Sequence, residues 1–171
     1  MIGRSFAPSA DNSLTMAEFP AIEDHGLIGD LRTVALVALD GTIDYFCYPA
    51  LDSASVFAAL LDPEQGGHFK LKPANDEVTI NQLYLPDTSV LVTRFASDDG
   101  VVELIDFMPA DGSGRLIRRA CAIRGRLPLI LECRPRFDYG KTAAHAEIVN
   151  GSVLFHHDDS PLRLTAATEF R

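Results

Sequence analysis

Residues 89–107, SVLVTRFASDDGVVELIDF, predict a β-hairpin. Both halves are rich in β-branched and aromatic residues, and the SDDG sequence at 97–100 between them has the composition of a tight turn. A second hairpin is predicted at Asn150-Gly151, because this dipeptide readily adopts the positive φ angles of a two-residue hairpin turn. Paired antiparallel strands are therefore the expected framework.

Working outward from these hairpins, the same composition recurs between turn residues along the chain. The remaining strands are predicted at 33–37, 42–47, 68–71, 78–85, 116–123, 127–133, 146–149, 152–155 and 162–165. One short helix is predicted, capped by Ser53 or Ser55, running through 56–61 and ended by Asp62-Pro63, with Phe57, Leu60 and Leu61 packing it on a sheet. The expected fold is all-β, an antiparallel β-sandwich with one short helix.

Composition narrows the classes of function. The chain has 171 residues and a formal net charge of −9, which argues against nucleic acid or an anionic membrane surface as a partner. Residues 1–21 are expected to form a mobile tail and 22–171 one domain. No secretory signal or membrane-length apolar run is seen, so a cytoplasmic location is expected. Cys47, Cys121 and Cys133 have no metal-binding spacing and are interpreted as reduced core residues.

The sequence carries no pattern that indicates a metal or a cofactor. His156 and His157 are adjacent, so in a strand their side chains point to opposite faces and would not close on one ion. Aspartates are scattered near strand ends and turns, and no spacing fixes a hydrolytic pair among them. Asp44 is interpreted as an outward strand residue or as a hydrogen-bond partner within its hairpin. No catalytic residue is assigned.

Arginines are concentrated in one region. Seven lie between 115 and 136, where Glu132 is the only acid. They could form a docking surface for an acidic partner or an anion, with Arg134, Arg136 and Asp138 as candidate docking residues. The alternative, which we favour for the arginines as a group, is that they pair with the domain's own carboxylates.

The segment 40–57 combines aromatic and carboxylate side chains around a short loop. Tyr45, Tyr48, Asp52 and Ser53 are candidate contacts for a sugar, since rings stack on pyranose C–H faces and carboxylates accept hydroxyl hydrogen bonds. The alternative is structural, with Asp52 or Ser53 simply starting the predicted helix.

Several motifs in order resemble the opening of glycoside hydrolase family 15 proteins, the glucoamylase-like and trehalase-like enzymes. They are IEDHGLIGDLRT at 22–33, DGTIDY at 40–45, YLPDTSVLVTRF at 84–95, DFMP at 106–109 and RPRFDY at 134–139. This chain departs from the family pattern at Tyr45, where the family has Trp, at Ala50-Leu51, where it has Arg-Phe, and at Ala54, where it has Pro. The loss of that arginine beside Asp52 weakens the case for a sugar contact there.

The resemblance implies an amino-terminal β-supersandwich that precedes a helical (α/α)6 barrel. In the family, that barrel carries the two catalytic glutamates, and no long helical period appears in this chain. We therefore expect a non-catalytic domain whose parent hydrolyses α-glucosides by inversion, in glucoamylase-like or trehalase-like fashion. The alternatives are a stand-alone carbohydrate-binding module and a purely structural docking domain.

The expected partners follow from this interpretation. They are the catalytic helical barrel of the parent, an α-glucoside as a candidate ligand, and a second copy of the chain when the domain is isolated. The strand at 152–155 is expected to be an unprotected sheet edge, and therefore a place where copies could associate.

Overall fold

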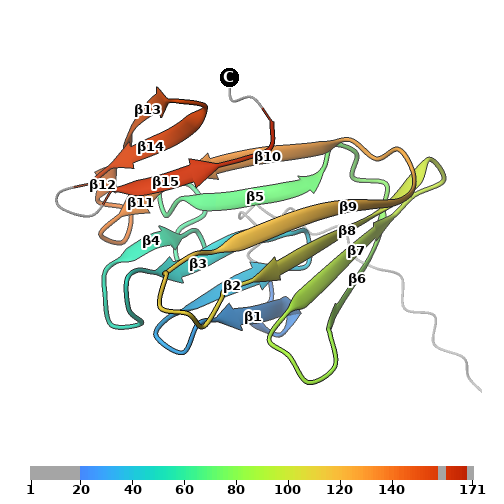
Figure 1. Ribbon diagram of the computed structural model, residues 1–171, viewed down its shortest axis with the longest axis horizontal. Coiled ribbons are helices and arrows are strands. Elements are labelled where there is room, and N and C mark those ends of the chain that lie inside the picture. The colour runs from blue at the N-terminus through green and yellow to red at the C-terminus, as the bar shows by residue number, and fades with distance from the viewer. Residues whose placement is uncertain (1–19, 158–160, 169–171) are drawn as a thin grey trace, which may run out of the picture.

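The computed structural model describes residues 20–157 and 161–168, so residues 1–19 of the predicted tail, together with Asp158 and Asp159, lie outside it. In this part of the chain, strands follow one another with a single 3₁₀ turn at the start (Figure 1). The elements are η1 Ile22–Asp24, β1 His25–Gly29, β2 Val34–Ala38, β3 Thr42–Cys47, β4 Ser55–Ala58, β5 His68–Pro73, β6 Thr79–Tyr84, β7 Leu91–Ala96, β8 Gly100–Phe107, β9 Ile117–Gly125, β10 Leu129–Arg134, β11 Arg136–Phe137, β12 Thr142–Ala143, β13 His145–Val149, β14 Ser152–His156 and β15 Leu162–Thr165.

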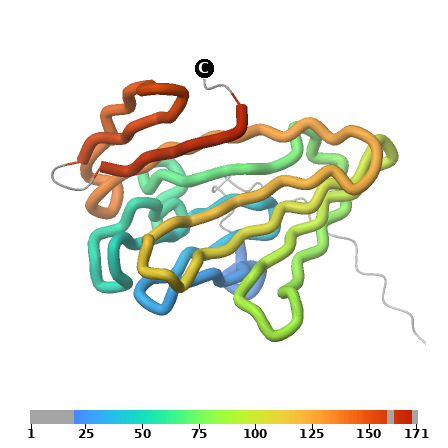
Figure 2. The backbone as a smooth tube through the Cα atoms, in the orientation of Figure 1, coloured from blue at the N-terminus to red at the C-terminus, as the bar shows by residue number. Residues whose placement is uncertain are grey.

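Two antiparallel sheets form the body of the molecule. The larger has the order β1-β2-β3-β5-β10, with β4 also paired to β3, and the smaller has the order β6-β7-β8-β9. A three-stranded sheet, β13-β14-β15, and the short pair β11-β12 lie at one end of the larger sheet (Figures 1 and 2). The expected all-β antiparallel sandwich is confirmed.

The core lies between the two main sheets. Alternate residues of the larger sheet, such as Ile28, Ile43 and Phe69, are buried because they face the smaller sheet. The smaller sheet contributes Leu91 to this cluster, and its Phe95 and Leu104 pack with Leu71 of β5 in a second cluster. Strand alternation therefore accounts for most of the apolar burial.

Both hairpins predicted from the turns at 97–100 and Asn150-Gly151 are present. β7 pairs with β8 in continuous register across the turn at 97–99. β13 pairs with β14 around Asn150 and Gly151, whose φ angles of 51° and 75° are those of a type I′ turn.

The predicted short helix is wrong. Residues 55–58 form the strand β4, which pairs antiparallel with β3 so that Phe57 lies opposite Phe46. All four residues of β4 are buried, a burial that a surface helix of two turns could not give to every side chain. The β-branched and aromatic residues Val56 and Phe57 also suit a strand, and so short a helix has little stability of its own.

The packing predicted around that helix is only partly right. Phe57 is buried, but Leu60 is half-buried and Leu61 is 62% exposed. The chain turns immediately after β4, where the N–H groups of Leu61 and Asp62 both donate to the carbonyl oxygen of Ala58. This turn carries Leu61 away from the sheet.

The predicted free edge at 152–155 is also wrong. β14 is the central strand of its sheet, with β13 on one side and β15 on the other. The edges of that sheet are β13 and β15 instead, because the chain returns after β14 and adds β15 to it.

A buried ion pair ties the two main sheets together. Arg118 of β9 forms a bidentate pair with Asp106 of β8, with N···O distances of 2.9 and 3.0 Å. Its guanidinium also donates to the carbonyl oxygens of Phe69 and Gly41 in the larger sheet, and it lies 4.9 Å from the centre of the Phe69 ring. Arg118 is therefore a structural residue, with four hydrogen bonds to the two sheets and the turn between β2 and β3.

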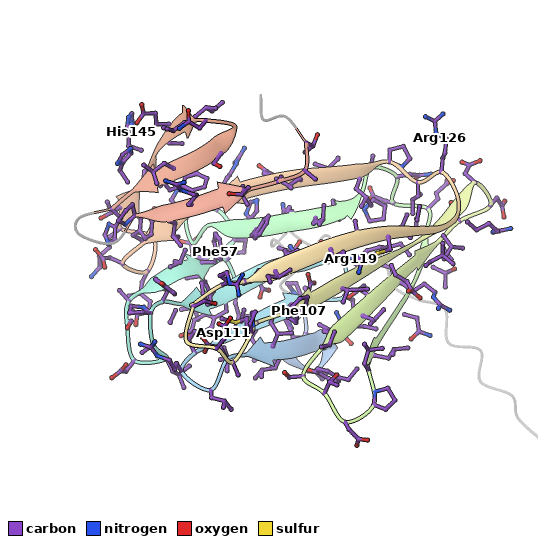
Figure 3. All side chains as sticks on the ribbon, viewed as in Figure 1. Phe57, Phe107, Asp111, Arg119, Arg126 and His145 are labelled. Atoms are coloured by element: carbon purple, nitrogen blue, oxygen red, sulfur yellow. The ribbon has the colours of Figure 1, made fainter. Side chains whose placement is uncertain are left out.

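Other arginines divide between pairing and exposure. Arg115 pairs with Asp111 and Arg134 with Glu132, in agreement with the interpretation that the domain's own carboxylates take up these charges. Arg119 and Arg126 are exposed and form no ion pair with a described residue (Figure 3).

Candidate functional site

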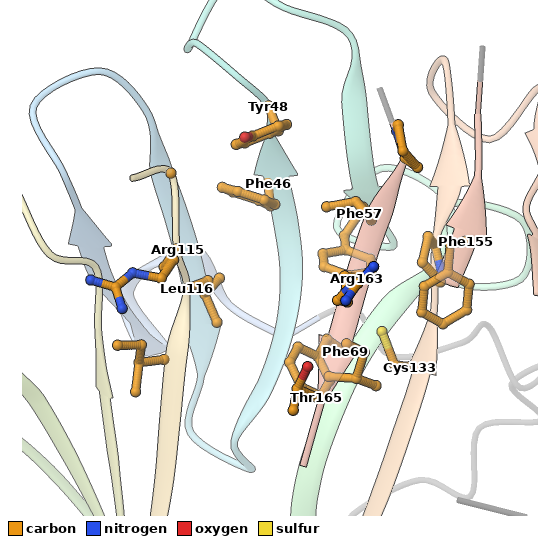
Figure 4. Close-up of a pocket in the computed structure, with 16 residues that line it drawn as sticks. Phe46, Tyr48, Phe57, Phe69, Arg115, Leu116, Cys133, Phe155, Arg163 and Thr165 are labelled. Atoms are coloured by element: carbon orange, nitrogen blue, oxygen red, sulfur yellow. The ribbon is translucent and has the colours of Figure 1, made fainter. Parts of the chain in front are cut away.

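An apolar cavity of about 440 Å³ opens where the start of β9 approaches β3, β4, β5 and β15 (Figure 4). Its volume is within the range of ligand pockets, roughly 300–1,000 Å³. Five aromatic residues from four strands and the loop after β3 supply most of its apolar lining: Phe46, Tyr48, Phe57, Phe69 and Phe155.

The rings form a connected series because their strands are neighbours. Phe46 of β3 and Phe57 of β4 are cross-strand partners, with ring centroids 6.3 Å apart. Phe57 is also 6.3 Å from Phe69, and Phe46 is 6.1 Å from Tyr48. These distances and the tilted ring planes are typical of favourable aromatic pairs. The sheet therefore holds Phe46, Phe57 and Phe69 in place, and the loop after β3 adds Tyr48.

Tyr48 reaches this cavity because Gly114 leaves room for it. A Cβ atom on Gly114 would lie 2.8 Å from the Tyr48 hydroxyl oxygen, closer than real side-chain contacts allow. Gly114 also has a φ of +64°, a conformation that glycine adopts without strain. Two segments more than sixty residues apart in the sequence thus fit together at the cavity.

The polar groups at the cavity are mainly cationic. Arg115 and Arg163 both line it and both are exposed. Arg115 is held 2.7 Å from Asp111, and hydrogen bonds from Ser113 together with Arg115 lower the pKa of Asp111 to about 2. Burial raises the pKa of Cys133, which also lines the cavity, to about 12, so its thiol stays protonated and unreactive at neutral pH.

The described lining includes no Asp or Glu. Inverting glycoside hydrolysis uses one carboxylic acid to protonate the leaving group and a second carboxylate to activate water. The lining residues that the structure describes therefore suit apolar contact and anion attraction rather than hydrolysis.

Of the four predicted sugar-contact residues, Tyr48 alone is among the described lining of this cavity. Tyr48 lines the cavity, whereas Tyr45 does not, and its hydroxyl oxygen accepts a 3.5 Å hydrogen bond from the Cys47 thiol. That hydrogen bond and burial raise the pKa of Tyr45 to about 12. Asp52 is exposed, and Ser53 belongs to a local turn in which its Oγ accepts from the Ala50 N–H at 3.1 Å.

The three predicted docking residues have different local roles. Arg134 ends β10 and pairs with Glu132, while Arg136 lies on β11 opposite Ala143. Asp138 has a positive φ of 54°, and its carbonyl oxygen accepts from the Lys141 N–H within a turn. Their roles in docking stay predictions.

The adjacent histidines have different neighbours. His157 stacks on Phe137, with centroids 4.0 Å apart, whereas His156 lies 3.3 Å from Glu147. Asp158 and Asp159, the acids that follow them, lie outside the described residues.

Sequence reasoning missed most of this cavity. Phe155, Leu116 and Arg163 come from separate strands or strand ends, and no motif links them. Their meeting depends on how the small β13-β14-β15 sheet packs over β5 and β10. The one available signal was the aromatic run in β3, which pointed to Tyr48.

The position of Asp44 differs from the expectation of an outward residue or a hydrogen-bond partner within its hairpin. It does not point outward into solvent but is 4% exposed, and its Oδ2 lies 2.8 Å from Nε2 of His25. Its partner lies on β1 rather than within the β2–β3 hairpin, because the three strands share one sheet.

Two stacked antiparallel sheets, with an aromatic cavity at one end, define a β-sandwich domain. Within that class, the chain belongs to the trehalase-like amino-terminal domain family, which matches residues 12–169. The expected resemblance to glycoside hydrolase family 15 is thereby confirmed.

Curated relatives of this chain are longer proteins. The chain is 30% identical to a trehalase of Thermoplasma volcanium over 94% of its own length and 27% of that protein. It is 39% identical to trehalase 1 of Sulfolobus acidocaldarius over 67% of its length and 19% of that protein. It is 30% identical to a trehalase of Mycolicibacterium smegmatis over 74% of its own length and 22% of that protein. The chain thus spans about a quarter or less of these relatives. No solved structure matches it.

Proposed function

We propose that this domain is the amino-terminal part of a glycoside hydrolase that cleaves an α-glucoside by inversion. Trehalose is the favoured substrate of the complete protein. The relatives named as trehalases support this, because each aligns with the domain over only part of its own length. The complete protein then includes a catalytic region outside this chain. The residues of this chain take no part in bond cleavage.

The observation that carries the non-catalytic role is the cavity lining. Aromatic rings and two arginines line the cavity, and no carboxylate pair faces it among the described residues. We infer that this cavity contacts the catalytic helical barrel. Tyr48 would then be a barrel contact rather than a sugar contact.

An activity assay tests this proposal. The 171-residue chain and the complete parent protein are incubated separately with trehalose, maltose and isomaltose. We expect hydrolysis by the parent and none by the chain. Hydrolysis by the purified chain that disappears when one of its own carboxylates is replaced would overturn the proposal.

A variant of the parent tests the contact. Phe46→Ala would also disturb the core, so Arg163→Glu at the exposed cavity rim is the sharper change. We expect it to lower the midpoint of parent denaturation while leaving the isolated chain unchanged. Arg126→Glu, an exposed arginine away from the cavity, is the matched control.

A cytoplasmic location is part of the proposal. Cys47, Cys121 and Cys133 are all free thiols, a state that a reducing compartment maintains. Within the part of the chain that the structure describes, no helix has the length and apolar character needed to cross a membrane. Fractionation of the source cells, with the parent detected by antibody, checks the location.

A further inference from the structure

A second pocket, of about 150 Å³, lies against β3 and β5 and shares no lining residue with the aromatic cavity. Thr42 and Asp44 line it from β3, and His68 and Lys70 line it from β5. Between them, Ile43 pairs with Phe69 in the core. Because side chains alternate along a strand, this pocket lies on the face of the larger sheet that points away from the sandwich core.

One carboxylate oxygen of Asp44 is buried in this region without a partner. The Oδ2 atom is 2.8 Å from His25 Nε2, and His25 Nδ1 is 2.9 Å from the carbonyl oxygen of Ala21, so the carboxylate is oriented firmly. The Oδ1 atom forms no hydrogen bond with a described residue. Since an unpaired buried polar atom is costly, Oδ1 calls for a hydrogen-bond donor from outside the described chain.

The imidazole of His68 is in a similar position. His68 is 9% exposed, and its Nε2 makes no hydrogen bond with a described residue although Glu132 Oε2 is 3.4 Å away. Burial, with the nearby charge of Lys70, lowers the pKa of His68, so the ring is neutral at neutral pH. The register that pairs Thr42 with Lys70 brings His68 beside Asp44 on the same face.

The charges around the pocket nearly cancel. Asp40 and Asp44 are acidic, while Lys70 and His25, which bonds Asp44, are basic. Glu132, which lies beside His68, is paired with Arg134. No three His, Cys, Asp or Glu side chains converge on a metal position among the described residues. A neutral ligand is thus favoured over a cation or an anion.

Size and wall chemistry restrict the ligand further. A volume of 150 Å³ is about five times the ~30 Å³ share of one liquid water, yet it is below the ~300 Å³ of drug-sized ligand sites. Ala38, Ala59 and Pro63 form apolar walls beside the polar groups. A hydroxyl group can both donate to a carboxylate and bond an imidazole nitrogen, and a ring bearing adjacent hydroxyls also presents C–H faces to apolar walls.

We propose that this pocket binds a neutral polyol the size of a single sugar ring. One hydroxyl donates to Asp44 Oδ1, and a neighbouring hydroxyl bonds His68 Nε2. The site is independent of the proposed catalytic parent, because every residue that it uses belongs to this chain.

Nuclear magnetic resonance titration of the 171-residue chain tests this site. The imidazole signals of His68, assigned by comparison with His68→Gln, are followed during additions of D-glucose, myo-inositol and glycerol, with sodium phosphate and ammonium chloride as charged probes. We expect saturable movement of the His68 signals with at least one polyol ring and not with either salt. The proposal would be overturned if the His68 signals saturated with phosphate or ammonium alone, or if no polyol saturated them.

Two variants make the test specific. Ala59→Leu fills the pocket and keeps its polar groups, so we expect loss of polyol binding; Ala110→Leu, at an exposed position elsewhere, should bind normally. Asp44→Asn should weaken binding about tenfold, as loss of a charged hydrogen-bond acceptor does. If Asp44→Asn does not fold, Ala59→Leu decides, and binding that survives this substitution contradicts the proposed site.

Discussion

At the scale of single residues, two buried ionic contacts organise the molecule. Arg118 and Asp106 are 2% and 0% exposed and connect the smaller sheet to backbone carbonyls of the larger one. His25 and Asp44 connect the start of the described chain to β3. Charges in such positions are stable only while both partners are present.

Replacing Asp106 with alanine should destabilise the domain strongly. Asp106→Ala leaves the Arg118 guanidinium buried without its counter-charge, so the free energy of unfolding should fall by about 3–5 kcal/mol. Chemical denaturation measures the change. The paired replacement Asp106→Leu with Arg118→Met should lose less, since it leaves no unpaired charge; an equal loss in both proteins would contradict this explanation.

The contact between His25 and Asp44 should depend on pH. Burial disfavours the His25 imidazolium, but the hydrogen bond and charge of Asp44, with the Ala21 carbonyl, outweigh it and raise the pKa of His25. Burial also raises the pKa of Asp44, an effect that His25 only partly offsets. The folded protein therefore holds the His25 proton more firmly than the unfolded chain, whose histidine pKa is about 6.5.

The sign of the stability effect follows from this direction. The contribution of His25 is fully present below pH ~6.5 and is lost as the pH rises through the raised folded pKa. The denaturation midpoint of His25→Gln should therefore differ more from that of the original protein in mildly acidic buffer than in mildly alkaline buffer. His68 has a lowered pKa and acts in the opposite direction, so the comparison between the two proteins isolates His25. A difference that grows as the pH rises would contradict the prediction.

At the scale of elements, pairing rather than local preference decides the structure of residues 55–58. An isolated segment with a serine cap and the sequence VFAALL favours a helix by local preference. In the folded chain, β3 offers the segment a hydrogen-bonded partner, and Phe46 and Phe69 offer Phe57 an aromatic environment. The partner strand is close in sequence, yet the residues of the segment do not by themselves predict this pairing.

Phe57 should be important for stability in the strand as it was expected to be in a helix. It is 4% exposed within the aromatic series, so Phe57→Ala should cost about 3–5 kcal/mol. Thermal or chemical denaturation measures the loss. Leu61→Ala is the control that separates strand from helix, because Leu61 is 62% exposed and should change stability by less than about 0.5 kcal/mol.

At the scale of the whole molecule, the outer strands of the two main sheets remain open to association. β6 is an outer strand of the smaller sheet and pairs only with β7. Its sequence, TINQLY, has no charged residue, and five of its six residues are exposed. Natural edge strands are commonly protected by charge, and β6 lacks that protection.

We therefore predict a homodimer of the isolated chain through β6. Mutual repulsion at a net charge of −9 is screened over about 8–10 Å at physiological salt, so it does not prevent contact between sheet edges. Light scattering at high micromolar concentration should give twice the monomer mass. Leu83→Lys should restore the monomer, whereas Ile148→Lys, at a similarly exposed position on β13, should leave the dimer intact. A monomeric mass for the unmodified chain would refute the prediction.

Most of the longer strands, both hairpins and the family can be recognised from the amino-acid sequence alone, whereas β1, β4 and the short pair β11-β12 were not predicted. Alternation of β-branched and aromatic residues and the turn preference of Asn150-Gly151 are local properties, so they can be recognised without knowing the fold. The aromatic run that marks β3 also drew attention to Tyr48, which lines the cavity, and its role as a sugar or barrel contact stays a prediction.

Which segments meet depends on the tertiary structure. Phe155 joins Phe57 and Tyr48 at one cavity. Arg118 pairs with Asp106 on the smaller sheet. Asp44 has one unpaired carboxylate oxygen and lies beside His68. Each of these depends on strand order and register, which long-range pairing sets after the local preferences have been satisfied. The same cause turned residues 55–58 from the expected helix into β4, because backbone pairing with β3 and burial of all four side chains outweigh the small helix preference of so short a segment.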